Sequence, residues 1–175
     1  MSNNDVVAMA TQFAQCDDDI LVWAEEAANR NFKDRLDAWS AISAQVNTLL
    51  TLHLAGIGGA LAFTVQCLIT AGNHRVFGVA AATSCFYLML LAWALMCLCI
   101  LSTETPTQGN EPKNLLVPAE TLKRVRPGEL ATLQRRISWQ AMLNGQRAKR
   151  LDTLRLLTAG KPIVFLAAAT ATAMG

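Results

Sequence analysis

Two long apolar runs dominate this sequence, residues 49–71 and 76–101, and only residues 72–75 separate them. A helix rises about 1.5 Å per residue, so about 20 apolar residues cross a bilayer core of about 30 Å, and both runs reach that length. Neither run contains Asp, Glu, Lys or Arg, whereas a helix of this length on a soluble protein normally has a polar face. The runs therefore predict an all-α integral membrane protein built around a transmembrane helical hairpin.

The C-terminal segment is a third candidate span. Residues 162–175 carry no charge but would form a helix of only about 21 Å, which is too short to cross. Starting the helix at Leu156 gives the required length and places Lys161 near the interface, where its long side chain can reach polar surroundings. We expect a third membrane helix over 156–175. The alternative is a hydrophobic tail packed against the cytoplasmic helices.

The distribution of charge predicts the orientation. Residues 102–161 hold eleven basic and five acidic side chains, whereas residues 1–48 hold eight acidic and three basic ones. Basic residues next to membrane helices stay in the cytoplasm, so the segment after the second run is expected there. Two crossings then place the N-terminus in the cytoplasm as well. We expect a multi-pass protein of the cell inner membrane whose acidic and basic segments attract each other.

The segment before the first run is predicted to be mostly helical. Residues 1–17 are expected to form a flexible N-terminus, and residues 18–48 a cytoplasmic helix that is continuous with the first membrane helix. Asp17 to Asp19 suit the start of that helix. From Ala28 onward its apolar positions alternate in steps of four and three if Arg35 is counted, which is the heptad pattern of a coiled coil. The apolar positions are Leu21, Ala28, Phe32, Trp39, Ile42, Val46 and Leu49.

After the second run, residues 102–128 read as a cytoplasmic loop with a short helix that ends before Pro127. A basic amphipathic helix is expected over 129–158. One of its faces is apolar, and the basic residues on the others are Arg135, Arg136, Arg147, Lys149 and Arg150. That basic surface could bind an anionic ligand such as a nucleotide, or inner-leaflet phospholipid. The alternative is neutralisation of the acidic segment together with the positive-inside bias.

The first membrane helix has two faces of small residues. His53, Gly56, Ala60 and Thr64 share one face, and Gly59 lies on another. Small residues four apart let helices approach closely in lipid. Our hypothesis is that these five residues form a homo-oligomer interface and the lining of a pore, with His53 at its mouth. The alternatives are packing within one chain and a neutral His53 bonded to a carbonyl or a headgroup.

Several classes of function are not expected. His53 has no acidic or basic partner within the apolar runs, which gives a proton relay or ion-coupled transporter little support. No phosphate-binding loop, nucleophile with a nearby base, or pair of carboxylates is present, so we expect no enzyme and no cofactor. Four of the five cysteines lie inside the apolar runs and the chain has two histidines, so no metal site is expected. No motif for nucleic-acid binding is present.

The run Asn47-Thr48-Leu49-Leu50-Thr51-Leu52-His53-Leu54-Ala55-Gly56, within residues 37–63, continues a long polar helix into a Gly/Ala-rich apolar one. Together with the basic helix over 129–157, it resembles the small transmembrane effectors of bacterial antiphage defence, especially the Pycsar membrane effector group. The resemblance implies a homo-oligomeric inner-membrane protein that permeabilises or depolarises the membrane once triggered. It also implies a trigger, such as a nucleotide second messenger or a soluble partner protein.

Two other classes have the same set of helices. A phage-type holin also consists of two or three membrane helices. A membrane scaffold or accessory subunit could instead dock a soluble partner on the helices over 18–48 and 129–158.

Overall fold

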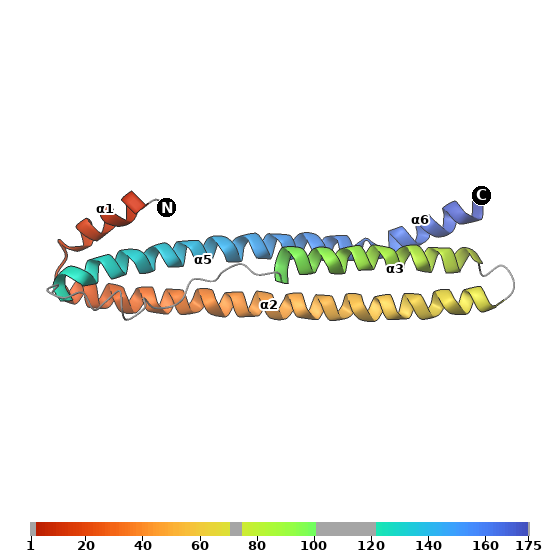
Figure 1. Cartoon of the computed structure of the whole chain (residues 1–175), viewed down its shortest axis with the longest axis horizontal. Helices are drawn as coiled ribbons and strands as arrows, with labels where there is room; N and C mark the ends of the chain where they lie inside the picture. The colour runs from red at the N-terminus through yellow and green to blue at the C-terminus, as the bar shows by residue number, and fades with distance from the viewer. Residues whose placement is uncertain (1–2, 71–74, 101–121, 175) are drawn as a thin grey trace. The chain divides into compact units, whose positions relative to one another are not determined.

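The computed structural model describes residues 3–70, 75–100 and 122–174, and these residues form helices without any strand. The elements are α1 (Asn3–Phe13), α2 (Asp18–Ile69), α3 (Arg75–Leu95), the π-helix η1 (Met96–Ile100), α5 (Leu122–Ala159) and α6 (Lys161–Met174) (Figure 1). Three stretches are long and apolar enough to cross a membrane. They lie in α2, in α3 with η1, and in the continuous α5–α6 region. The predicted all-helical class is therefore confirmed.

Three element boundaries differ from the sequence predictions. The N-terminal segment, which we expected to be flexible, contains α1, whose half-buried residues Val6, Met9 and Phe13 recur at helical spacing. A helix end was expected before Pro127, but α5 continues through this residue. Pro127 lies in the first two turns of α5, where a missing N–H removes one hydrogen bond near a helix end. The remainder of that prediction, over residues 102–121, lies outside the described residues.

The third boundary is at Gly160, where the helix expected over 156–175 is divided into α5 and α6. The Gly160 amide donates to the carbonyls of Leu156 and Leu157 at 3.2 and 3.1 Å, and the Ile163 amide donates to the Gly160 carbonyl at 3.0 Å. Pro162 has no amide hydrogen to continue the α5 ladder, so a new helix begins here. The fourteen residues of α6 reach only about 21 Å.

The chain divides into two compact units, and α2 and α5 contribute to both. The polar unit contains Met1–Ser40 and Thr103–Gly145, and the apolar unit contains Ala41–Ser102 and Gln146–Gly175. Each unit pairs α2 with α5 in parallel, because higher residue numbers on one helix meet higher numbers on the other. In the polar unit Glu25 bonds Arg126, and in the apolar unit His53 bonds Thr158.

The core of the polar unit forms around Phe32 of α2, which is fully buried between Leu133 and Ile137 of α5. The side chains of Arg126 and Glu25 make a two-point ion pair beside this core, with N–O distances of 2.9 and 3.2 Å. This pair joins the acidic N-terminal segment to the basic one, as the opposite net charges predict. Both side chains are only about a quarter exposed, and the two-point contact gives the pairing of α2 with α5 geometric specificity.

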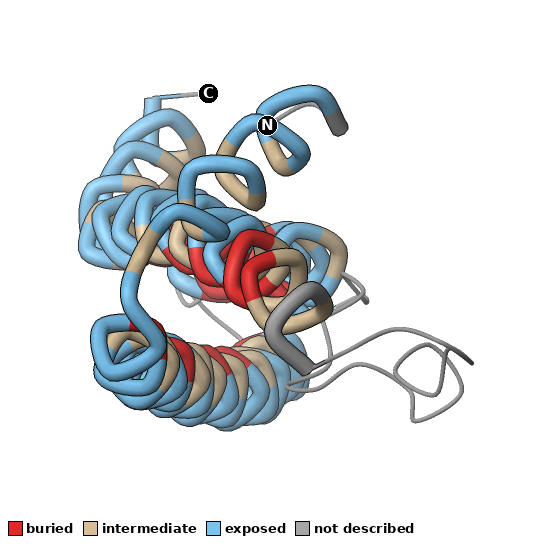
Figure 2. Tube along the Cα trace, turned by 90° about the vertical axis from the view of Figure 1, so that its left-hand side faces the viewer, coloured by how far each residue is buried: buried red, intermediate tan, exposed pale blue. Residues whose placement is uncertain are grey.

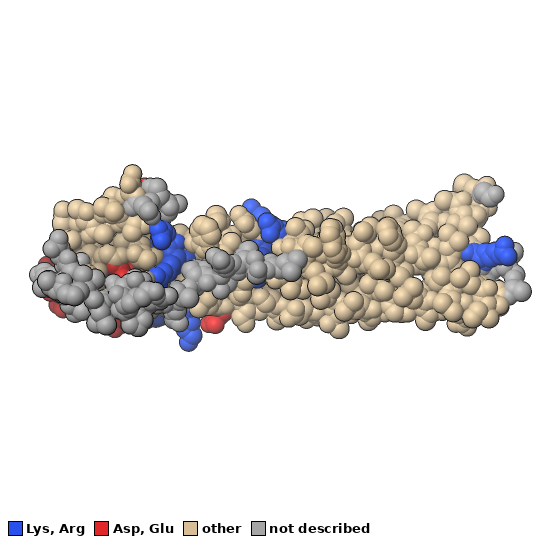
Figure 3. All heavy atoms as spheres, viewed as in Figure 1, with Lys and Arg blue, Asp and Glu red and all other residues tan. Residues whose placement is uncertain are grey.

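The core of the apolar unit lies where α2, α3, η1 and α5 meet. Its buried residues are Val46, Leu49, Leu91, Leu95, Cys99, Leu151 and Leu154. The outward sides of the same helices carry large apolar side chains such as Phe63, Phe86 and Trp93, all about half exposed or more. Figure 2 shows buried positions on the inner sides of the helices, and Figure 3 shows little charge along the visible face of α3. An apolar outer surface of this kind suits a lipid environment.

Candidate functional site

The apolar unit contains a buried polar cluster between α2 and the end of α5. His53 is only 1% exposed, and its Nε2 lies 2.9 Å from the Thr158 hydroxyl oxygen. That hydroxyl donates its hydrogen to the Leu154 carbonyl at 2.8 Å. A hydroxyl has a single hydrogen, so the Thr158 oxygen accepts and His53 Nε2 donates. The ring Nδ1 is buried and has no partner among the described residues.

The helix break at Gly160 brings two more polar side chains near this cluster. The Tyr87 hydroxyl of α3 donates to the Leu157 carbonyl at 2.8 Å, which anchors the last turn of α5. Lys161 begins α6, and its Nζ lies 3.6 Å from the position that a Cβ would occupy at Gly56. Gly56 lies one helical turn from His53 on the same side of α2, which places the Lys161 ammonium near the His53 side chain. His53 therefore has a basic neighbour inside the apolar unit, which corrects the expectation that it has none.

Most of the predicted pore-lining residues face inward within a single chain. A Cβ at Gly56 would lie 2.9 Å from Leu88 Cδ1 of α3, so the absence of a side chain permits this close approach. Ala60 and Thr64 are half-buried on the same side of α2, and the Thr64 hydroxyl donates to the Ala60 carbonyl. This arrangement agrees with the alternative in which that face of α2 packs within one chain.

Gly59 belongs to the other small-residue face, and the structure leaves that face open. No atom of the described chain lies within 4 Å of a Cβ added at Gly58 or Gly59. Ala55 and Ala62 beside them are exposed. The first apolar run thus has one face that packs inside the chain and one that a second helix could approach.

The predicted basic surface on α5 is not a single surface. Arg135 and Arg136 belong to the polar unit, whereas Arg147, Lys149 and Arg150 belong to the apolar unit. Arg135, Arg136 and Arg147 each have an interaction partner. Arg147 is buried at 7% exposure, and its burial lowers the pKa of the guanidinium, with the neighbouring Arg150 charge acting in the same direction.

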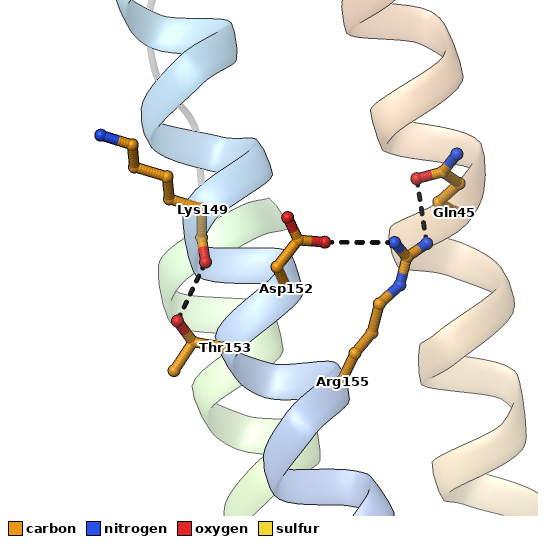
Figure 4. Close-up of polar contacts among 5 residues, drawn as sticks. All are labelled: Gln45, Lys149, Asp152, Thr153 and Arg155. Atoms are coloured by element: carbon orange, nitrogen blue, oxygen red, sulfur yellow. Dashed lines mark hydrogen bonds and ion pairs between the residues drawn. The ribbon is translucent and has the colours of Figure 1, made fainter.

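The last two basic residues of that group, Lys149 and Arg150 of α5, differ in their contacts. Arg150 Nη1 donates to the Leu98 carbonyl in η1 at 3.1 Å, and this contact places a cation at a helix C-terminus, where the dipole favours it. Lys149 is exposed, and in Figure 4 its side chain points away from the contacts of its neighbours.

A polar contact between α2 and α5 lies one turn beyond Lys149. Arg155 donates to the Asp152 carboxylate at 3.3 Å and to the Gln45 amide oxygen at 3.0 Å (Figure 4). Gln45 precedes the first apolar run by four residues. Arg155 therefore neutralises Asp152, which is the acidic residue of α5 closest to the apolar helices.

The polar unit has a buried polar layer of its own. Gln140 is fully buried and donates its amide to Asn144 Oδ1 at 3.1 Å, and Asn144 Nδ2 donates to the Arg35 carbonyl at 2.7 Å. The Gln140 side-chain oxygen has no partner among the described residues. Polar residues at positions that face a neighbouring helix fix register and cost stability.

An apolar groove of about 330 Å³ lies at the N-terminal end of α2 within the polar unit. Phe13 at the end of α1, Trp23 of α2 and Leu130 of α5 contribute to its walls. Trp23 is 70% exposed. An exposed aromatic side chain beside an apolar groove is typical of a surface that meets a partner.

Nothing in the sequence pattern places Tyr87, Thr158 and Lys161 beside His53. Lys161 was recognised as an exceptional charge near an apolar helix, and this signal could have identified it as a site residue. Thr158 and Tyr87 gave no such signal, because isolated hydroxyl side chains are common in apolar helices.

Comparisons with protein-family models, with characterised proteins and with solved structures find no match to this chain.

Proposed function

We propose that this protein is a homo-oligomer of the bacterial inner membrane that makes the membrane leaky. The supporting observation is the polar cluster of His53, Thr158 and Lys161 among helices whose outward side chains are apolar. Ionisable side chains within membrane helices are costly, and they typically mark a path for ions or a functional site. The chain would act as an effector in antiphage defence, where leakage stops the infected cell.

Self-association through the open face of α2 completes the proposal. Gly58 and Gly59 have no neighbour within 4 Å of an added Cβ, so the backbone of a second α2 could approach closely there. The N-terminus and the polar unit would lie in the cytoplasm, and a trigger binding to the polar unit would open the assembly. A nucleotide second messenger and a soluble protein are the two kinds of trigger that the resemblance implies.

The proposal is tested by expressing the full chain in bacteria while membrane potential and dye entry are recorded. We expect depolarisation and dye entry, together with an oligomer larger than a dimer after extraction in mild detergent. Gly59→Leu fills the open face and is expected to reduce both oligomer size and leakage. Ala82→Leu is the matched control, because Ala82 is also exposed on an apolar helix but lies on α3.

The remaining outcomes separate the classes. Leakage that requires phage infection or an added nucleotide supports the triggered effector, whereas leakage at a fixed time after expression without any trigger indicates a holin. A monomer or dimer that never leaks from cells or from reconstituted vesicles contradicts the proposal.

A docking role is the second candidate function, and the apolar groove of the polar unit favours it. Trp23 and Ile20 are more than half exposed at this groove. An accessory subunit could hold a soluble partner here. If Trp23→Ser abolishes a phenotype while leakage is absent in the unchanged protein, the docking role replaces the pore.

A further inference from the structure

The apolar groove of the polar unit follows the two helices that form it with a regular spacing. Its wall residues recur in steps of four and three on both helices; they include Ile20, Ala24 and Ala27 on α2 and Leu130, Gln134 and Ile137 on α5. Residues three and four apart share one side of a helix, so both helices present a continuous side to the groove. This is the spacing with which a further helix packs against a parallel helix pair.

The side chains of the groove differ in size in a way that suits a helix. Ala24 and Ala27 are small and leave room for large apolar side chains of a partner. Trp23 is 70% exposed and Ile20 is 53% exposed at the same groove. A helix that binds in a groove inserts apolar side chains three and four residues apart, and exposed aromatic side chains are common anchors of such contacts.

The groove lies in the most acidic part of the chain. Residues 1–29 contain six Asp or Glu and no Lys or Arg. Glu25 and Glu26 are paired with arginines. The three aspartates at 17–19 are exposed, and they lie in the chain between two residues of the groove wall. The end of the groove at the start of α2 therefore carries negative charge.

This charge decides which class of partner fits. The inner leaflet is anionic, and nucleotides and nucleic acids carry phosphates, so the aspartates at 17–19 repel all of them. A basic partner is attracted to the same surface, which raises its association rate and fixes its orientation. An apolar floor with acidic surroundings therefore favours a helix that is apolar on one side and basic beside it.

We propose that the groove of the polar unit binds an amphipathic helix of a soluble protein, with large apolar side chains at heptad spacing and Lys or Arg next to the start of α2. This inference names the class of partner for the triggered leakage proposed above. It rests on that function only where the partner acts as the trigger, because binding is measured separately from leakage.

Binding is tested on the full-length protein in nanodiscs of neutral phosphatidylcholine, by fluorescence anisotropy of three labelled peptides. The first is a three-heptad helix with Leu at the core positions and Lys elsewhere, the second has Glu in place of Lys, and the third is a scrambled form of the first. We expect saturable binding of the first peptide alone, after subtraction of its binding to empty nanodiscs. Higher salt should weaken this binding.

Two variants and a control localise the peptide. Trp23→Ala should weaken binding at least about tenfold, as expected for an aromatic anchor. Trp139→Ala is the matched control, because Trp139 is also exposed but follows Leu130 by two and a half helical turns and so lies on the opposite side of α5. Binding to it should equal that of the unchanged protein.

Replacement of the three aspartates at 17–19 by Asn is the second variant, because Asn removes the charge and still caps a helix. Binding of the basic peptide should weaken about tenfold and lose its dependence on salt. In a chain whose other cysteines are replaced by Ala, the bound peptide should also slow maleimide modification of Cys16, which lines the groove.

The role as trigger is tested in cells by co-expression of the same basic helix fused to a soluble carrier protein. We expect the fusion to increase depolarisation in cells that contain the unchanged protein and not in cells that contain Trp23→Ala. Cells that express the fusion without the membrane protein show how much depolarisation the helix causes by itself.

Each result bears on the groove or on the pore. Binding of the basic peptide that is absent, or equal in Trp23→Ala, overturns the proposal, and so does equally tight binding of the acidic peptide. A smaller oligomer in Trp23→Ala without peptide binding assigns the groove to a second copy of the chain and also overturns it. Peptide binding without any leakage leaves the groove site intact and removes the pore. Leakage that depends on Gly59 and not on Trp23 retains the pore and removes the trigger.

Discussion

The His53 ring depends on a single hydroxyl group from another helix. Among the residues that the structure describes, Thr158 alone hydrogen-bonds the ring, and its oxygen accepts because its own hydrogen is used by the Leu154 carbonyl. A buried polar group that loses its partner costs more than the bond itself contributed. The stability of this part of α2 and α5 should therefore respond to Thr158 far more than to other threonines on the same helix.

We predict that Thr158→Val lowers the free energy of unfolding by about 1–3 kcal/mol, because both ring nitrogens of His53 are then buried without partners. The measurement is chemical or thermal unfolding in mild detergent. Thr153→Val is the matched control, since Thr153 is exposed and bonds only the Lys149 carbonyl of its own helix. Equal effects of the two substitutions would contradict the assigned hydrogen bond.

The buried face of α5 follows a heptad pattern along the helix. Eight of its buried positions alternate in steps of three and four, with Ala131 and Leu143 buried beside them; the eight are Leu130, Leu133, Ile137, Gln140, Asn144, Arg147, Leu151 and Leu154. Three consecutive members are polar or charged, which conceals the repeat in the sequence. A coiled-coil pattern with a polar middle fixes the register of a helix and gives up stability.

We predict that Asn144→Leu destabilises the polar unit by about 1–3 kcal/mol, because it leaves the buried Gln140 amide with neither end bonded. The double substitution of Gln140 and Asn144 by Leu should recover most or all of that loss, because replacing both polar partners removes the unpaired groups. A double-mutant cycle by urea unfolding measures the coupling. Additive effects of the two substitutions would show that the buried layer is not a connected pair.

The two units differ in the surfaces that they present. The apolar unit has large apolar side chains on its outer sides, whereas α2 in the polar unit is covered by charged residues such as Lys33, Asp34 and Asp37. These surfaces suit lipid and water respectively. The proposed orientation follows, with the polar unit in the cytoplasm and the short connection between α2 and α3 on the other side.

We predict that cysteine labelling of intact cells follows this orientation. In a chain whose other four cysteines are replaced by Ala, Cys16 should react with a membrane-permeant maleimide and not with an impermeant one. A variant that carries only Asn73→Cys should react with the impermeant reagent. Labelling of Cys16 by the impermeant reagent in sealed cells would reverse the proposed topology.

Much of the helix content followed from local pattern. The helical spacing of apolar residues from Ala28 to Leu49, with Arg35 filling one position, predicted a helix that continues into the apolar run, and α2 extends over both. Charge-free length predicted two of the three stretches that could cross a membrane, and the third required the inclusion of Lys161. These features depend on hydrophobic periodicity and on the rise per residue, which are properties of neighbouring residues along the chain.

The contacts between distant residues required the tertiary structure. The packing of α2 against α3 decided which small-residue face of α2 lies inward. Leu88 of α3 lies against Gly56 of α2, and Cys67 of α2 lies against Gly78 of α3. The sequence identified His53 and Lys161 as costly groups near apolar helices but did not show that they are neighbours. Their proximity depends on the parallel register of α2 with α5 and on the break at Gly160, and register between helices is set by packing over the whole seam, which single residues do not encode.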